Sequence, residues 1–276
     1  MKKKVNFFDR TLRKDYWTVL SIISILVTLG SIFVNIPDKR KLIVATIFIG
    51  ILLVTYVIMW IRANLLREMK ISIDNSIVEV RVGNIFEEEE LKVIAFNEYF
   101  DTLVNNVVIS ERTLNGMYIK NVIQDVAEFD KLIENDESLM EKTIGTHQNR
   151  RVGKKKRYKL GTIFKHNDYL LTAFTKFDDE NRAFLYMNDY VNFLLNFWNE
   201  IDIVYNGRSI SIPLLGSGIT RFKEYNSISD QELLELLIWS FKISRIKFTY
   251  PSKVSIIIHD SRSGKINFYK LKELTQ

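Results

Sequence analysis

The chain has no cysteine, and this absence removes several classes of chemistry at once. Without cysteine there is no disulfide framework, no thiolate nucleophile and no cysteine-ligated zinc. Histidine is also scarce: His147, His166 and His259 are the full set, and no two of them lie at a spacing typical of metal ligands. Ser217 has no histidine and aspartate partners that the sequence reveals. We therefore assign no catalytic residue and expect no metal site.

Basic residues exceed acidic ones by a small margin, 39 Lys and Arg against 33 Asp and Glu, but they cluster. Seven lie in the run from Arg150 to Lys159, where Tyr158 is the only aromatic residue, which argues against nucleic-acid binding. A contact with anionic lipid and a solvated loop remain open interpretations of this run. Six more basic residues precede the first apolar stretch: Lys2, Lys3, Lys4, Arg10, Arg13 and Lys14.

Two long stretches contain no charged residue, from Tyr16 to Pro37 and from Leu42 to Ile61. Each has about the 20 residues that an α-helix needs to cross ~30 Å of hydrocarbon. No small-x-small cleavage site follows the first stretch, and a second stretch does, which argues against a secretory signal peptide. The sequence therefore predicts a hairpin of two transmembrane helices over residues 16–62.

The distribution of charge predicts the orientation of this hairpin. Because basic residues crowd before the first stretch and recur after the second, the positive-inside bias places both termini in the cytoplasm. Residues 1–15 are then a basic cytoplasmic tail, and residues 63–70 are a short stalk that continues the second helix. The soluble body occupies residues 71–276.

Patterns typical of strands and helices alternate along the soluble body. Strands are predicted within Ile71–Val82, as a hairpin or two short strands, and at Leu91–Phe96, Ser209–Leu215 and Val254–Ile258. Apolar residues recur at helical spacing over residues 122–140, 184–198 and 229–241. Residues 102–109 fit a helix or a strand equally well. Alternation of this kind predicts an α/β domain with helices packed on a sheet.

A glycine turn stands out in this body, in the segment from Ser211 to Arg221. It reads as a short buried strand that runs into Gly216-Ser217-Gly218, followed by a helix with a capping box at Ser229 and Glu232. Glycine permits positive φ and close approach of a ligand, and free backbone N–H groups at the end of a strand can hold a phosphate. A tight turn without a ligand is the plain alternative.

Three motifs in order resemble those of macro domains, which bind ADP-ribose. They are Val82-Gly83-Asn84-Ile85-Phe86, Val93-Ile94-Ala95-Phe96-Asn97, and the strand with proline that leads into Gly216-Ser217-Gly218-Ile219. The resemblance implies a macro-domain-like mixed sheet flanked by helices. The ligand-binding residues that it implies are Asn84, Ile85, Asn97, Asn115, Gly116, Leu215, Gly216, Ser217, Gly218, Ile219, Thr220 and Phe222, with Phe222 stacking on a ring of the ligand.

The chain departs from the macro-domain pattern at three places. Asn84 stands where most members have an aspartate that grips adenine, and Ala95 where many hydrolytic members have an asparagine. Thr113-Leu114-Asn115-Gly116 replaces the usual glycine-rich run. These departures weigh against hydrolysis more than against binding.

A divergent macro domain behind a two-span hairpin further resembles the ThsA effectors of Thoeris anti-phage systems, of the transmembrane macro-domain type. That resemblance implies a multi-pass protein of the bacterial inner membrane and a TIR-domain partner that makes an ADP-ribose-derived signal, histidine-ADP-ribose. The signal is the ligand, with no other cofactor, and it drives homo-oligomerisation and membrane disruption that end in abortive infection. A membrane-anchored ADP-ribosyl hydrolase is the alternative in a different class, and an α/β domain that docks another protein is a third.

Overall fold

The computed structural model describes residues 4–34, 36–224, 228–244, 246–249 and 251–275. The chain divides into two compact units. Unit 1 comprises residues 1–71 together with residues 266–276, and unit 2 comprises residues 72–265. The sequence predicts one ligand-binding domain over residues 71–276, whereas the structure groups the residues from 266 onward with the helical unit.

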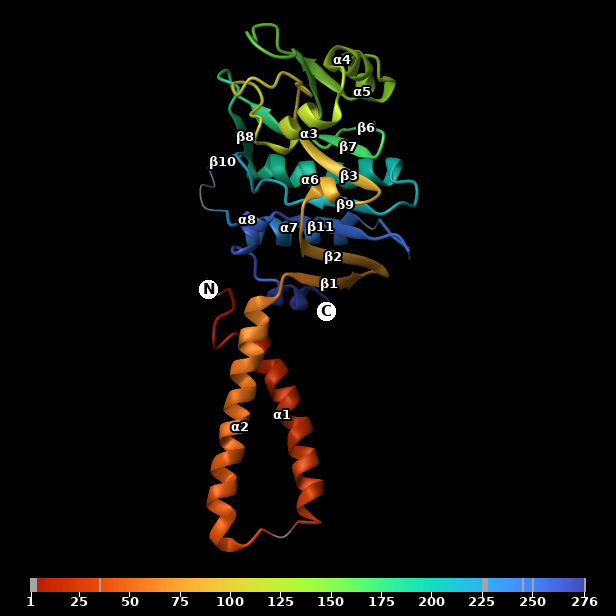
Figure 1. Ribbon diagram of the computed structural model, residues 1–276. Coiled ribbons are helices and arrows are strands. Elements are labelled where there is room, and N and C mark those ends of the chain that lie inside the picture. Colours follow the sequence, from red (N-terminus) through yellow and green to blue (C-terminus); the bar gives the residue numbers. More distant parts are fainter. Residues whose placement is uncertain (1–3, 35, 225–227, 245, 250, 276) are drawn as a thin grey trace. The chain divides into compact units, whose positions relative to one another are not determined.

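Unit 1 is built on two long helices, α1 (Arg10–Ser31) and α2 (Asp38–Leu65), drawn in red and orange in Figure 1. α1 begins where the side chain of Asp9 accepts hydrogen bonds from the N–H groups of Thr11 and Leu12, each at 3.0 Å. A 3-10 helix, η2 (Tyr269–Thr275), completes the unit. Its small core contains Val5, Leu12, Ala63 and Tyr269.

The buried amide of Asn64 joins the N-terminal segment to the end of α2. Its Oδ1 accepts hydrogen bonds from the N–H groups of Lys4 at 2.8 Å and Val5 at 3.0 Å. Its Nδ2 donates to the carbonyl of Trp60 at 2.9 Å, and the indole N–H of Trp60 donates to the carbonyl of Val5 at 3.0 Å. These bonds satisfy a polar side chain that is only 3% exposed.

Of the described helices, α2 alone is long and apolar enough to cross a membrane. The first turn of α1 is charged, and the helix ends at Ser31, before Pro37 closes the uncharged stretch. At ~1.5 Å per residue its uncharged part is about 24 Å long, against ~30 Å of hydrocarbon. The structure therefore shows one spanning candidate where the sequence predicts two. The predicted stalk is helical only as far as Leu65, because a strand begins at Glu68.

Unit 2 is organised around a sheet with the strand order β1-β2-β11-β9-β3-β7-β8-β10, in which β6 also pairs with β7 (Figure 1). The boundary between the units falls within β1. β2, β11, β9, β3 and β7 run parallel, whereas β6 and β8 run antiparallel to β7. The strands are β1 (Glu68–Ile73), β2 (Ser76–Val82), β3 (Leu91–Asn97), β6 (Ile163–His166), β7 (Tyr169–Phe177), β8 (Ala183–Tyr186), β9 (Ile210–Pro213), β10 (Arg221–Lys223) and β11 (Val254–Ile258), with a separate ribbon of β4 (Thr143–Thr146) and β5 (Lys156–Tyr158).

The helices of unit 2 follow the predicted pattern with two corrections. They are α3 (Leu114–Val122), α4 (Val126–Glu134), α5 (Glu137–Glu141), α6 (Met187–Val204), α7 (Asp230–Ser244), the short α8 (Asp260–Ser263) and the 3-10 turn η1 (Ile85–Glu87). The single helix predicted over residues 122–140 is two helices, because Asp136 caps a new one by accepting from the N–H of Leu139 at 2.8 Å. The helix predicted from residue 184 begins at Met187, after the short strand β8.

The four strand segments predicted from the sequence are present. The hairpin predicted within residues 71–82 is β1 and β2, with Asp74 and Asn75 in its turn at φ values of 45° and 70°. β11 has the predicted bounds. Residues 102–109, which the sequence leaves open, form neither element and make one isolated bridge between Val104 and Ile109.

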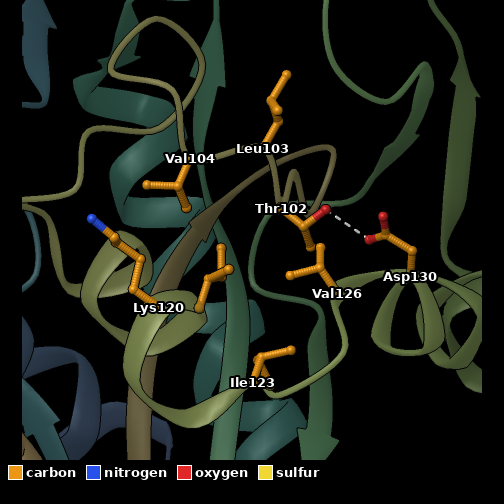
Figure 2. Close-up of a pocket in the computed structure, with 8 residues that line it drawn as sticks. Thr102, Leu103, Val104, Lys120, Ile123, Val126 and Asp130 are labelled. Atoms are coloured by element: carbon orange, nitrogen blue, oxygen red, sulfur yellow. Dashed lines mark hydrogen bonds between the residues drawn. The ribbon is translucent and has the colours of Figure 1, made fainter.

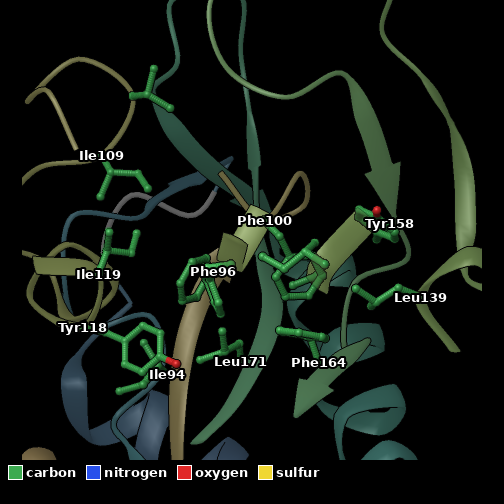
Figure 3. Close-up of a cluster of buried hydrophobic side chains, with 14 of the residues drawn as sticks. Ile94, Phe96, Phe100, Ile109, Tyr118, Ile119, Leu139, Tyr158, Phe164 and Leu171 are labelled. Atoms are coloured by element: carbon green, nitrogen blue, oxygen red, sulfur yellow. The ribbon is translucent and has the colours of Figure 1, made fainter. Parts of the chain in front are cut away.

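Apolar side chains cover both faces of the sheet. Ile94, Phe96 and Leu171 pack with Tyr118 and Phe164 in a cluster that includes residues of α3, α4 and α5 (Figure 3). Because successive strand residues face opposite sides, the residue after Ala173 belongs to the second layer. That residue, Phe174, lies 4.8 Å from the ring of Phe193 on α6. α6 in turn contacts α7, where the indole N–H of Trp198 donates to Ser240 Oγ at 2.8 Å.

The basic run from Arg150 to Lys159 is held by acidic side chains of unit 2. Arg150, 8% exposed, donates to both carboxylate oxygens of the fully buried Asp101, at 3.0 and 2.6 Å. Its guanidinium also lies 3.9 Å from the centroid of the Tyr99 ring. Lys154 pairs with Asp130 at 2.6 Å, and Arg157 with Glu98 at 3.3 Å. Three of the seven basic residues are thus engaged inside the domain, so neither a free loop nor a lipid-binding surface describes the run as a whole.

We expect Arg150→Ala to destabilise unit 2 by about 3–5 kcal/mol, because it leaves the buried carboxylate of Asp101 without its cation. The neighbouring Arg151 is exposed, and Arg151→Ala should change stability by no more than about 0.5 kcal/mol. The measurement is denaturation of the full chain in detergent, followed by tryptophan fluorescence, to which the buried Trp198 contributes. Equal effects of the two substitutions would contradict the structural role of Arg150.

Candidate functional site

Three loops of unit 2 meet at one edge of the sheet. β2 pairs in parallel with β11, β11 with β9, and β9 with β3. Strands that run parallel end at the same edge, so the loops after Val82, Pro213 and Asn97 are neighbours. Open α/β sheets bind their ligands at this carboxyl edge. All but two of the residues predicted to bind ligand lie in these loops or in the first turn of α3, which follows the β3 loop. Asn97 is the last residue of β3 itself, and Phe222 lies on β10.

The loop after β9 depends on a glycine. Gly216 has φ of +90°, and a Cβ placed there would lie 3.0 Å from the ring of Phe222 and 3.4 Å from Leu233. Leu215 is buried, and its carbonyl accepts a hydrogen bond from the hydroxyl of Tyr190 at 3.2 Å. The side chain of Ser217 donates to the carbonyl of Leu214 at 2.7 Å, within the turn itself. The loop is therefore held by contacts with buried side chains. Its residues are exposed or half-buried from Gly216 to Thr220.

Phe222 supports this loop. Its ring is 7% exposed and meets the ring of Tyr190 edge-on, with centroids 5.4 Å apart. The aromatic face predicted to stack on a ligand is therefore covered by the loop, and Phe222 acts on the candidate site through Gly216.

The helix predicted to follow the glycine turn is separated from it by β10, which pairs with β8 at the far end of the strand order. The capping box is present: Glu232 Oε2 accepts from the N–H of Ser229 at 2.7 Å, and Ser229 Oγ accepts from the N–H of Glu232 at 3.2 Å. These bonds occupy N–H groups at the start of α7. The sequence predicts a phosphate-binding site formed by a strand, a turn and a helix in direct succession. In the structure β10 interrupts this succession, so only the turn is left to form such a site.

The loop after β2 contains Asn84 and Ile85. Asn84 is exposed, and its Oδ1 accepts from the N–H of Phe86 at 3.2 Å while its Nδ2 donates to Glu87 at 2.9 Å. It therefore caps η1, a local role that the motif alone does not reveal. Ile85 is 3% exposed and belongs to the core, so its side chain anchors the loop.

The loop after β3 is ordered by Asn97, which is 1% exposed. Its Oδ1 accepts from the N–H groups of Tyr99 at 3.0 Å and Asp101 at 3.3 Å, and its Nδ2 donates to Asp101 Oδ2 at 3.0 Å. Asp101 is the carboxylate that binds Arg150. Burial raises the pKa of the neighbouring Glu98, against the opposing effect of Arg157. The sequence motif indicates Asn97, but it gives no sign of the ion pair between Asp101 and Arg150 to which Asn97 is hydrogen-bonded.

The first turn of α3 contains Asn115 and Gly116. Thr113 caps the helix by accepting from the N–H of Gly116 at 3.3 Å. A Cβ at Gly116 would lie 2.2 Å from the carbonyl oxygen of Ser110, so only glycine fits this packing. Asn115 is half-buried beside it. The packing against Ser110 therefore requires glycine at position 116 whether or not a ligand binds.

A separate cavity of about 490 Å³ lies between the loop after β3 and helices α3 and α4. Figure 2 shows Lys120 and Asp130 on opposite sides of its apolar lining, and Thr102 donates to Asp130 at 2.7 Å. None of the predicted ligand-binding residues lines it. Sequence reasoning missed Thr102, Leu103 and Val104 because the segment 102–109 has no regular periodicity. Within the described ranges, no group of three or more metal-ligating side chains is brought together.

Comparison with known proteins identifies the family of this chain. A family model described as the macro domain of the Thoeris protein ThsA matches residues 78–259. The curated Thoeris protein ThsA of Bacillus amyloliquefaciens (strain Y2) is 43% identical over 278 residues, which cover 96% of this chain and 90% of that protein. Two solved structures of the Oceanobacillus iheyensis macrodomain, one with ADP and one with MES bound, are 15% and 16% identical. Each has a TM-score of 0.48 and covers 75% of this chain and 96% of its own.

Unit 2 is thus a macro-domain-like α/β unit, a mixed sheet with helices on both faces and its loops gathered at one edge. The match of the family model over most of unit 2, and the identity to a curated relative over nearly the whole chain, decide the family. The chain belongs to the ThsA macro-domain family of Thoeris proteins.

The two glycines of the β9 loop should respond differently to alanine. Gly216→Ala should cost about 1–2 kcal/mol, because an L side chain is strained at positive φ and would press on Phe222. Gly218 has open space around it, and Gly218→Ala should be neutral or stabilise by about 0.4–1 kcal/mol. Urea denaturation of both variants measures the difference. If Gly218→Ala is the more damaging, the loop adopts a different conformation.

Proposed function

We propose that the carboxyl edge of unit 2 binds an ADP-ribose-type ligand, with the loop from Leu215 to Thr220 holding its phosphates. The observation that carries the proposal is the left-handed Gly216 at the junction of three loops, in a chain of the ThsA macro-domain family. Backbone N–H groups that no side chain covers bind phosphate well. Asn84 and Asn97 fit this site as residues that shape the neighbouring loops, and Asn115 and Gly116 as the first turn of α3.

The ligand proposed is a signal, histidine-ADP-ribose, made by a TIR-domain partner in anti-phage defence. The curated relative bears the name of a Thoeris protein, which supports a role in that system. In this proposal the protein acts as a sensor without catalysis, because Ala95 stands where many hydrolytic macro domains have an asparagine. Hydrolysis of ADP-ribose conjugates is the alternative outcome that the binding experiment below distinguishes.

The proposed site of action is the bacterial inner membrane, with both helices of unit 1 inserted and both termini cytoplasmic. α2 meets the length and composition that a span requires. Large apolar side chains are exposed along both helices, including Ile25 and Leu29 on α1 and Ile43 and Ile47 on α2, and such a surface needs lipid or a partner to cover it. Ligand binding would drive homo-oligomerisation of these helices, and the resulting membrane disruption would cause abortive infection.

The path of the chain supports a coupling between ligand and membrane. The chain passes between the units within β1 and again at residues 265–266. β2 and β11, the strands next to these crossings, both end at the candidate edge. In unit 1 the C-terminal segment is tied to α1, because Tyr269 and Lys272 both donate to Asp15, the latter at 2.7 Å. Partial burial raises the pKa of Asp15, but these hydrogen bonds outweigh it and leave the pKa lowered.

Calorimetry on the full chain in detergent should show binding of ADP-ribose or its histidine conjugate, and Gly216→Val should abolish it because a branched side chain fills the loop. Gly207→Val is the matched control: Gly207 also has positive φ, +70°, but lies before β9, at the other end of the same strand. It should strain the backbone without changing affinity. Absence of heat with every conjugate would refute the site, and turnover of ADP-ribosylated protein would establish the hydrolase.

Asp15→Ala should separate sensing from response, since it releases the C-terminal segment from α1. We expect ligand affinity to stay unchanged while ligand-induced crosslinking of oligomers in membranes, and growth arrest in cells that make the signal, decrease. Asp38→Ala is the control, because in the described part of the chain that aspartate pairs only with the exposed Lys41, at 2.6 Å. A chain lacking residues 1–62 should bind ligand yet leave growth intact. Growth arrest by this truncated chain would place the activity in unit 2.

A further inference from the structure

One face of α1 carries a cationic hollow that the proposed function does not use. The hollow has a volume of about 460 Å³. Its lining comes from a single helix and consists of three basic side chains, an indole and two hydroxyls: Arg10, Arg13, Lys14, Trp17, Thr18 and Ser21.

This face points away from the partner helix. The lining residues recur at steps of three and four, which places them on one side of an α-helix. The opposite side of α1 carries Leu12, fully buried, and Tyr16, whose ring contacts that of Tyr56 on α2 with centroids 5.0 Å apart. The hollow is therefore open to whatever surrounds the helix pair.

The cations of the hollow have no direct carboxylate partner. Across residues 4–34 and the other described ranges, Arg10, Arg13 and Lys14 form no ion pair, although the charge of Lys14 helps to lower the pKa of Asp15. The two nearest acids in sequence have other roles: Asp9 caps the helix, and Asp15 pairs with Lys272. A cluster of three unpaired cations repels itself and favours an anionic ligand.

The position of Trp17 indicates the level at which the hollow would meet a bilayer. Its indole is 63% exposed, about one turn beyond the cations, at the boundary between the charged turn and the apolar part of α1. Tryptophan favours the headgroup level of a bilayer, and the exposed side chains of Ile22 and Ile25 follow on the apolar side. The hydroxyls of Thr18 and Ser21 donate to helix carbonyls at 3.2 and 2.9 Å, so the cations must supply the donors.

We propose that this hollow binds the phosphate of an anionic phospholipid headgroup in the leaflet next to the N-terminus of α1. Two guanidinium groups and an ammonium supply several charged hydrogen-bond donors to the singly negative phosphodiester, and their excess positive charge favours a headgroup without a cation of its own; the indole covers the glycerol level. The bound lipid sets the depth at which α1 enters the membrane. This inference rests on the membrane insertion proposed above.

The test uses the full chain reconstituted in vesicles of phosphatidylcholine and phosphatidylglycerol, with one lipid brominated at a time. Bromine quenches tryptophan on contact, and the Trp17→Phe variant isolates the contribution of Trp17. We expect brominated phosphatidylglycerol to quench Trp17 more than brominated phosphatidylcholine at equal content. Combining Arg10→Gln, Arg13→Gln and Lys14→Gln should reduce that preference by about fivefold or more.

The matched control removes the same charge from the other end of the helix pair, with Lys39→Gln, Arg40→Gln and Lys41→Gln, and should retain the preference. If the two triple variants behave alike, the preference reflects net charge and the proposed site is refuted. Loss of the preference on addition of inorganic phosphate would assign the hollow to free phosphate instead of lipid. Arg13→Gln alone, with Arg13→Lys as its charge-conserving partner, provides the comparison if the triple variant fails to insert.

Flotation of the vesicles separates the two levels of the proposal. A chain that fails to float with vesicles of either composition overturns the membrane insertion and the lipid site together. A chain that floats without any preference for phosphatidylglycerol overturns the lipid site alone.

Discussion

The buried carboxylate of Asp101 holds together the part of unit 2 on which the candidate site depends. It accepts hydrogen bonds from Asn97, from both terminal nitrogens of Arg150 and from the N–H of Lys154 at 2.6 Å. A charge in this position is tolerated because a cation and several donors surround it. Through these bonds the loop that leaves β3 is fixed to the basic run some 50 residues later in the chain. This part of the carboxyl edge of the sheet is thereby held by buried, charge-assisted hydrogen bonds.

In unit 1, too, single polar side chains hold distant segments of the chain together. A single buried amide, Asn64, satisfies the backbone of the N-terminal segment, and a single carboxylate, Asp15, holds the C-terminal one. Both chain ends are thereby fastened to the helix pair at the charged end of α1. The helices beyond this point expose large apolar side chains, and an exposed apolar surface of this kind is typical of an interaction site.

Much of the architecture could be predicted from local patterns. Alternation of Ile and Val located β2, a compact apolar run located β3, and the spacing of Leu194 and Trp198 located α6. The candidate edge was also predictable, because motifs that follow parallel strands must meet at one edge. The roles of individual side chains were not predictable. Phe222 reads as a ligand contact in the sequence, yet its ring lies under Gly216, and the direction of a side chain on a short strand depends on which strand pairs with it.

The sequence by itself determined the family, the division between apolar helices and α/β body, and the need for a special backbone at Gly216. Each of these follows from residue identity or from the length of an uncharged stretch, which are local properties. Tertiary structure decided the rest. The single helix predicted over residues 122–140 is two helices, α4 and α5. β10 separates the glycine turn from α7, and the C-terminal segment groups with unit 1. Tertiary structure also turned the basic run into a set of ion pairs, because a charge finds its partner through folding contacts between residues far apart in the chain, which no local pattern records.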